Sequence, residues 1–205
     1  MLLASRAVRL GDLTKSLAWA IEITQAIQAQ GGPTTLWGGM SGTEVGSVVW
    51  STAVEDFAGY VAFGDSLANN SDFVRLAAVA RDHIEAVQPD GLDEVIHGVT
   101  GETKIGSFAT VVNANAANGQ WSNAGTWAVS ISMMVTEITG IPGMVTAGRA
   151  GQMGSFGWIA VHDNAAAIDD AAAKTAADPR YTESIESAAA MFLPGASTVY
   201  ARRIA

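Results

Sequence analysis

The chain has 205 residues, of which 49% are apolar and 15% charged, and its formal net charge is −9. This composition supports a folded core and excludes intrinsic disorder, and so acidic a chain has no basic face for a nucleic acid. There is no cysteine, which excludes disulfides, thiolate nucleophiles and zinc–sulfur sites. The three histidines show no metal-ligand spacing, so a haem or metal role would rest on a lone histidine, and we expect no metal and no cofactor. An export-type N-terminus and an apolar span of bilayer length are also lacking, which predicts a cytoplasmic protein without membrane contact.

The first elements in chain order are a strand over residues 1–10 and an amphipathic helix. The helix is indicated by Trp19, Ala20, Ile23 and Ile27, which recur on one face. Asp12 is its expected N-cap, and the glycines and proline at 31–33 end it.

Two strands joined by a glycine-containing turn follow at about 34–39 and 46–52. A second helical region begins after residue 52, and the polar run at 69–72 interrupts it. The last element of this half is a strand over about 92–99. The order strand–helix–strand–strand–helix–strand predicts a ferredoxin-like antiparallel sheet with helices on one face.

The rest of the chain repeats this order at the offset that places Trp127 on Trp19, and the register slips by three residues before the last strand, where Pro89 faces Pro194. Strands are expected at about 105–115, 143–149, 154–161 and 196–204, and a helix around Trp127 repeats the stripe around Trp19. Coincident positions include Trp19/Trp127, Ile23/Ile131, Gly32/Gly140, Trp50/Trp158 and Phe73/Tyr181. We therefore predict a tandem duplication with halves 1–101 and 102–205.

The predicted fold class is α+β, with two tandem ferredoxin-like βαββαβ repeats whose antiparallel sheets pack into one fused α/β barrel. Each half alone leaves one sheet face bare, and two halves can cover these faces with the helices outside.

The chain resembles the dimeric α/β-barrel superfamily, in particular its antibiotic-biosynthesis-monooxygenase, NIPSNAP-like and EthD-like groups. The resemblance is carried by the strands Gly46–Trp50 and Gly154–Trp158, each running into a helix, and by the segment Asp178–Tyr181. In that superfamily two chains usually pair, whereas both halves are fused here. The motifs specify architecture, and the superfamily includes oxygenases, isomerases, dehalogenases, haem-degrading enzymes and proteins without known activity.

The resemblance implies a small-molecule site inside the barrel that binds an apolar or aromatic compound. The activity class is cofactor-independent monooxygenation or isomerisation, and a homo-oligomer is a further expectation. The alternative is a non-catalytic structural or protein-interaction barrel, which the sparse polar inventory favours.

Two histidines on predicted strands are the candidate proton acceptors, because imidazole titrates near neutral pH. His97 shares a strand face with Val95 and Val99, and His162 shares one with Trp158. For each, the alternative is a structural role: a hydrogen bond to solvent or a loop for His97, and a helix start for His162.

The candidate substrate contacts are aromatic, with one cation. Trp50 and Trp158 lie on strands, where they face either the cavity or a helix. Trp37 precedes Gly38 and Gly39, which leave room for a planar ligand unless packing fills it. Arg149 is a cation near a predicted strand that an anionic ligand would use.

Overall fold

The computed structural model describes residues 1–99, 103–151 and 153–205, and its first half contains three α-helices. The strands of this half are β1 (Leu2–Leu10), β2 (Thr34–Ser41), β3 (Ser47–Val54), β4 (Ile84–Val87) and β5 (Gly91–His97). The helices are α1 (Leu13–Gln28), α2 (Phe57–Ala68) and α3 (Ser71–Ala78).

The second half follows the same order. Its strands are β6 (Phe108–Asn115), β7 (Gly143–Ala150), β8 (Ser155–His162) and β9 (Ser197–Arg203). Its helices are α4 (Trp121–Thr139), α5 (Ala165–Ala177) and α6 (Pro179–Ser187).

Eight strands form one closed antiparallel barrel in the order β1-β3-β2-β9-β6-β8-β7-β5, and β5 pairs with β1 to complete the circle. The two halves join edge to edge. β2 pairs with β9, where Trp37 lies opposite Arg203, and β5 pairs with β7, where Asp93 lies opposite Gly148. Closure therefore depends on backbone hydrogen bonds between the halves and confirms the predicted fold class.

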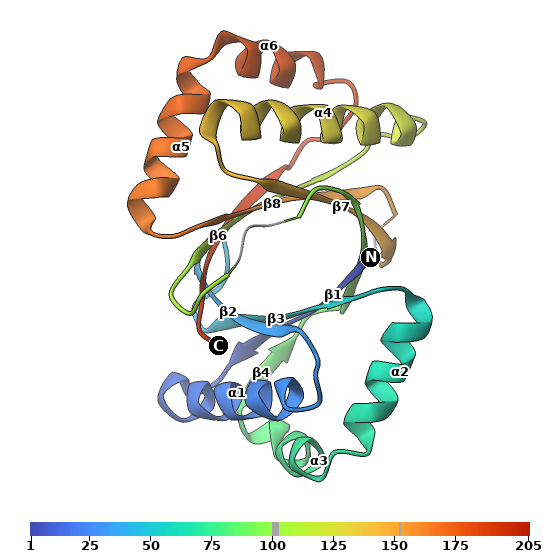
Figure 1. Cartoon of the computed structure of the whole chain (residues 1–205), viewed down its shortest axis with the longest axis vertical. Coiled ribbons are helices and arrows are strands. Elements are labelled where there is room, and N and C mark those ends of the chain that lie inside the picture. Colours follow the sequence, from blue (N-terminus) through green and yellow to red (C-terminus); the bar gives the residue numbers. More distant parts are fainter. Residues whose placement is uncertain (100–102, 152) are drawn as a thin grey trace.

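The helices cover the outside of the barrel in two groups, with α1, α2 and α3 at one end of the molecule and α4, α5 and α6 at the other (Figure 1). Helix α1 begins where expected, because the Asp12 carboxylate accepts hydrogen bonds from the backbone N–H groups of Thr14 and Lys15. Asn70 and Asp178 cap α3 and α6 in the same way, which explains why both second helical regions are interrupted.

Each half places the same tryptophan pair between its helices and its sheet. The ring centroids of Trp19 and Trp50 lie 6.0 Å apart with an interplanar angle of 82°. Those of Trp127 and Trp158 lie 5.9 Å apart at 79°. The tryptophan on the long helix donates its indole N–H to a backbone carbonyl in both halves, that of Leu76 and that of Ser184. These contacts agree with a duplication, which stays a prediction.

The segment between α3 and β5 contains one strand that was not expected. Strand β4 is additional: it pairs with the end of β1 beyond the point where β5 begins. In the segment just before β4, the imidazole of His83 stacks on the indole of Trp19, with centroids 4.9 Å apart at an interplanar angle of 9°. This stacking places His83 against the buried Trp19 of the core.

The predicted boundary between the halves, at 101/102, lies outside the described residues. Across the described ranges, no helix is both long and apolar enough to cross a bilayer.

Candidate active site between the sheet and the helices

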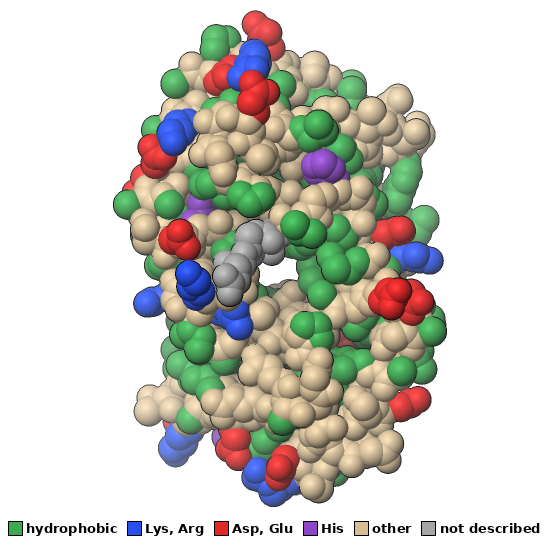
Figure 2. Space-filling view, viewed as in Figure 1, with side chains coloured by type: hydrophobic (Ala, Val, Ile, Leu, Met, Phe, Trp, Pro, Cys, Tyr) green, Lys and Arg blue, Asp and Glu red, His purple; other side chains and the backbone are tan. Residues whose placement is uncertain are grey.

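A cavity of about 550 Å³ lies in the second half, between the outer face of the sheet and the helices α4, α5 and α6. The expected position was the barrel interior, so the cavity lies on the opposite face of the same strands. In Figure 2 an opening lies at the centre of the molecule with hydrophobic side chains along part of its rim, and charged side chains lie both at the sides of the barrel and over the helical ends. The helix-side cavity is separate from this axial opening.

Among the described residues that line the cavity, none is charged. The polar groups there are one imidazole, two phenols and four aliphatic hydroxyls, contributed by His162, Tyr181, Tyr200, Thr110, Ser132, Thr139 and Thr175. The remaining lining is aliphatic and aromatic. Few convergent polar groups in an apolar cavity are typical of a small-molecule site, and the lack of charge favours an uncharged ligand.

The cavity exists because α5 carries small side chains where α2 carries large ones. Its cavity face consists of Ile168, Ala171, Ala172 and Thr175, at helical spacing. Phe63 and Leu67 are the equivalents of Ala171 and Thr175 in the repeat, and both pack against the core of the first half.

Glycines at the ends of α1 and α4 show the same difference. A Cβ atom added to Gly32 would overlap the ring of Phe63, whereas one added to Gly140, its equivalent in the repeat, would meet nothing within 4 Å. The first half therefore fills with side chains the space that the second half leaves open.

His162 ends β8 and lies at the polar side of the cavity. Its side chain is almost completely buried, at 5% exposure, and its Nε2 lies 3.1 Å from the Thr110 hydroxyl oxygen. The Nδ1 atom is also buried and has no hydrogen-bond partner in the described part of the chain. Burial lowers the pKa of His162, because the charged imidazolium is poorly solvated there. His162 is therefore neutral at pH 7, and its Nδ1 is a buried nitrogen left unpaired by the described residues.

The opposite side of the cavity is aromatic. Phe192 lies with its ring centroid 5.3 Å from that of Trp127 and 5.8 Å from that of Trp158. Both indole N–H groups already donate to helix carbonyls, those of Ser184 and Ala128, so the rings offer mainly apolar surface. Trp158 and His162 share one face of β8 and are separated by about 13 Å at the usual rise of a strand. That length suits a flat ligand of two or three fused rings.

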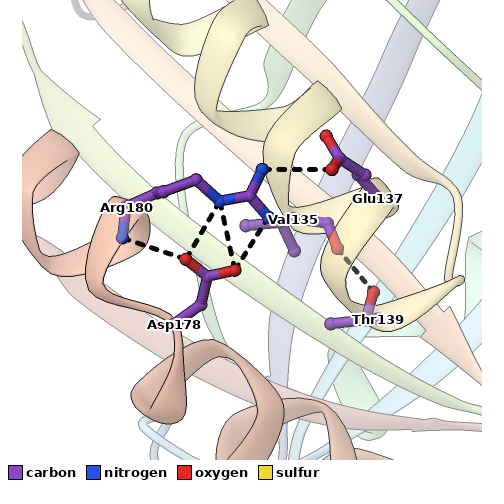
Figure 3. A network of polar contacts seen from close by, with 5 residues as sticks. All are labelled: Val135, Glu137, Thr139, Asp178 and Arg180. Carbon is purple, nitrogen blue, oxygen red and sulfur yellow. Dashed lines mark hydrogen bonds and ion pairs between the residues drawn. The ribbon is translucent and has the colours of Figure 1, made fainter.

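Helix α6, which covers part of the cavity, is held to α4 by charged groups. Figure 3 shows Arg180 between Asp178 and Glu137, with its guanidinium nitrogens 2.8 Å and 3.1 Å from their carboxylate oxygens. The side-chain hydrogen bond from Arg180 lowers the pKa of Asp178. In the adjoining turn of α4, the Thr139 hydroxyl donates to the carbonyl of Val135, and both residues line the cavity.

Trp158 and His162 are the two expected site residues that line this cavity. Trp50 is buried in the first half, where its indole N–H donates to the Thr24 hydroxyl. Trp37 is half-buried on β2 and donates to the Thr35 hydroxyl. The space beside Gly38 and Gly39 is not open, because Ile204 and Thr43 occupy it.

His97 and Arg149 also lie away from the cavity. His97 is half-buried at the end of β5, next to a register shift between Val95 and His97. Arg149 is exposed on β7, where its guanidinium lies 3.5 Å from the Glu94 carboxylate, beside a separate and more polar hollow. The structure thus brings together one of the two candidate histidines and one of the three candidate tryptophans.

Reading the sequence missed Thr110, Ser132 and Tyr200 as lining residues, and also the alanine-rich face of α5. The sequence does contain a signal for the position of the cavity. Positions that are equivalent in the repeat but large in one half and small in the other, such as Phe63 and Ala171, mark where packing is lost.

Comparison with known proteins finds no family model and no curated protein that matches the chain. Solved structures do match. A candidate monooxygenase from Fusobacterium nucleatum superposes with a TM-score of 0.73 at 10% identity, covering 100% of this chain and 92% of that one. An anthrone oxidase-like protein gives 0.69 at 11% identity, covering 100% and 91%. A candidate monooxygenase from Lactobacillus acidophilus gives 0.64 at 15% identity, covering 98% and 93%.

These likenesses agree with the strand order. The protein has a ferredoxin-like fold, with both halves of a closed eight-stranded barrel in a single chain.

Proposed function

We propose that this protein binds an uncharged, flat and largely apolar small molecule in the cavity of its second half. We further propose that it acts on this ligand as a cofactor-independent monooxygenase or isomerase. The observation that carries the proposal is the buried Nδ1 of His162, unpartnered within the described ranges, at the wall of an apolar cavity whose described lining holds no charge. The monooxygenase and anthrone oxidase-like names of the structural neighbours support the same class of chemistry.

The proposed role of His162 is to accept a proton from a carbon or hydroxyl acid of the ligand. A neutral imidazole can do so. None of the described lining residues is charged, so the charge that stabilises the resulting imidazolium is that of the ligand anion beside it. Thr110 holds the ring through Nε2, and in this proposal the unpaired Nδ1 accepts the proton. Because Nδ1 is buried in the structure, the ring must shift slightly for the ligand to reach it. The carbanion or enolate then reacts with dioxygen in an oxygenase, or is reprotonated at another atom in an isomerase.

Binding is tested by the quenching of tryptophan fluorescence on titration with anthracene and anthrone, because Trp127 and Trp158 line the cavity. Ala171→Phe restores the large side chain found at the equivalent position of the first half and should abolish saturable quenching. The matched control is Ala173→Phe on the exposed side of α5, which should bind as wild type does. No saturable quenching in wild type would contradict the proposal and favour the non-catalytic barrel.

Catalysis is tested separately by oxygen consumption with anthrone as substrate. His162→Gln keeps a polar side chain of similar size and should bind anthrone while losing at least tenfold in turnover, within the usual contribution of a general base of about 10²–10⁴. Binding without turnover in wild type would leave a binding protein and exclude the oxygenase.

A further inference from the structure

The side chain of Ser132 is buried in the cavity wall without a hydrogen-bond partner among the described residues. It lies on α4 at 6% exposure, and none of its neighbours in the described ranges bonds to its hydroxyl. A hydroxyl on an otherwise apolar wall is more stable when it has a hydrogen-bonding partner. The Ser132 oxygen is not among the fully buried unpaired atoms and belongs to the cavity lining, so its partner comes from the contents of the cavity, either solvent or a ligand.

The equivalent residue of the first half is fully bonded. Thr24, which matches Ser132 in the repeat, donates to the carbonyl of Ala20 at 2.6 Å and accepts from the indole N–H of Trp50 at 2.8 Å. In the second half the indole N–H of Trp158 donates directly to the carbonyl of Ala128, at 3.0 Å. Ser132 therefore does not accept a hydrogen bond from the indole of Trp158, as Thr24 does from that of Trp50.

The sheet beneath Ser132 also lacks the pair of threonine hydroxyls that the first half has at the equivalent place. In the first half, Thr34 lies opposite Thr52 and their hydroxyl oxygens are 2.7 Å apart. In the second half, Ala160 takes the position of Thr52 in the repeat and lies opposite Gly143. A Cβ atom added to Gly143 would lie 3.0 Å from the Ser132 hydroxyl oxygen. The Ser132 hydroxyl thus lies against the Gly143 backbone, where a side chain on residue 143 would crowd it.

We propose that Ser132 forms an oxygen-recognition subsite in the cavity wall, in which the serine hydroxyl donates a hydrogen bond to a carbonyl or hydroxyl oxygen of the ligand. This inference rests on the proposed function and adds to it: the ligand carries an oxygen substituent on the ring part that lies under α4. A charged substituent is disfavoured because the described lining includes neither a cation nor a carboxylate. The subsite is distinct from His162, which lies at the end of β8.

The test compares 9-fluorenone with fluorene, two flat tricyclic compounds that differ by one carbonyl oxygen. Affinities for both are measured by calorimetry with the full-length wild type and with Ser132→Ala. Wild type should bind fluorenone about 2–10-fold more tightly than fluorene, the range expected for one neutral hydrogen bond. Ser132→Ala should lose this preference and keep its affinity for fluorene.

Two variants serve as controls. Ser130→Ala removes an exposed hydroxyl from the same helix and should keep the preference. His162→Gln tests whether the carbonyl is read at the other polar group of the site. If both probes bind and the preference survives in Ser132→Ala, or is lost only in His162→Gln, the subsite is overturned while the proposed function stands. If neither probe binds wild type, both fail.

The melting temperature distinguishes a serine that is hydrogen-bonded within the protein from one that is not. Thr24→Ala breaks two hydrogen bonds and should lower the Tm by about 2–4 °C or more for a chain of this size. Ser132→Ala breaks none within the described ranges and should leave the Tm of the ligand-free protein unchanged or slightly raised. An equal loss of Tm in the two variants would show that Ser132 is bonded within the protein, and would overturn the proposal.

Discussion

His162 and Thr110 are joined by a single contact, 3.1 Å from Nε2 to the hydroxyl oxygen, which holds the imidazole while its Nδ1 stays buried and, among the described residues, unpaired. The two residues come from adjacent strands, β8 and β6, whose antiparallel register fixes their relative position. The contact orients the imidazole of the cavity without satisfying both of its nitrogens. This arrangement affects both ligand binding and the pH dependence of stability.

The first expectation concerns pH. Burial lowers the pKa of His162 in the folded state below the value of about 6.5 usual for an unfolded chain. Between the two values the unfolded chain binds more protons, so stability from this group is complete above about pH 6.5 and is lost as pH falls. Urea denaturation at several pH values between 7.5 and 5 should show a smaller loss in His162→Gln than in wild type. Parallel curves would show that the ring is solvated.

The second expectation concerns the paired tryptophans. Trp19 is buried in the filled half, so Trp19→Ala should cost about 3–5 kcal/mol of unfolding free energy. Trp127 is half-buried and borders the cavity, so Trp127→Ala should cost an amount at or below the lower end of that range. Chemical denaturation measures both. Equal losses would mean that the cavity does not reach Trp127.

The third expectation concerns Phe63 and Ala171, which occupy equivalent positions in the two halves. Phe63→Ala should open a cavity under α2 and cost about 3 kcal/mol, since Phe63 packs against the core of the first half. Ala171→Phe should cost much less, because the space it enters is already empty. Thermal melts of the two variants test this. A loss for Ala171→Phe as large as that for Phe63→Ala would indicate that the second half is already filled.

The fourth expectation concerns assembly. A fragment of residues 1–101 would expose the edges of β2 and β5, which β9 and β7 cover in the whole chain. Unpaired edges promote association, so size-exclusion chromatography should show a homodimer or aggregates. A soluble monomeric fragment with a cooperative melt would contradict the dependence of each half on the other.

The positions of most helices and strands follow from local features of the chain. The stripe of Trp19, Ile23 and Ile27 places α1, and Asp12 fixes its start through two backbone hydrogen bonds. The internal repeat carries the same order into the second half and leads to the barrel. Strand β4 escaped prediction because four residues are too few to show a periodic pattern.

The strand face of a candidate residue is harder to obtain from sequence. Strict alternation puts His97 on the face of Val95, but the register shifts between these residues, and an irregular strand breaks the alternation on which that assignment depends. His162 lies in a regular stretch of β8, so its relation to Trp158 could be predicted. Alternation does not reveal whether their shared face turns inward or toward the helices.

The sequence by itself thus determined the element order, the two-half barrel and the pairing of Trp158 with His162, because these depend on periodicity and on residues close in the chain. Only the tertiary structure decided that the cavity lies outside the barrel and in one half. Empty space depends on the summed volumes of side chains from several elements, here Ala171 on α5, Gly143 on β7 and Ser132 on α4. Each of these residues is ordinary in its own segment, and only their convergence leaves His162 and Ser132 facing a space that the first half fills with Phe63 and Leu67.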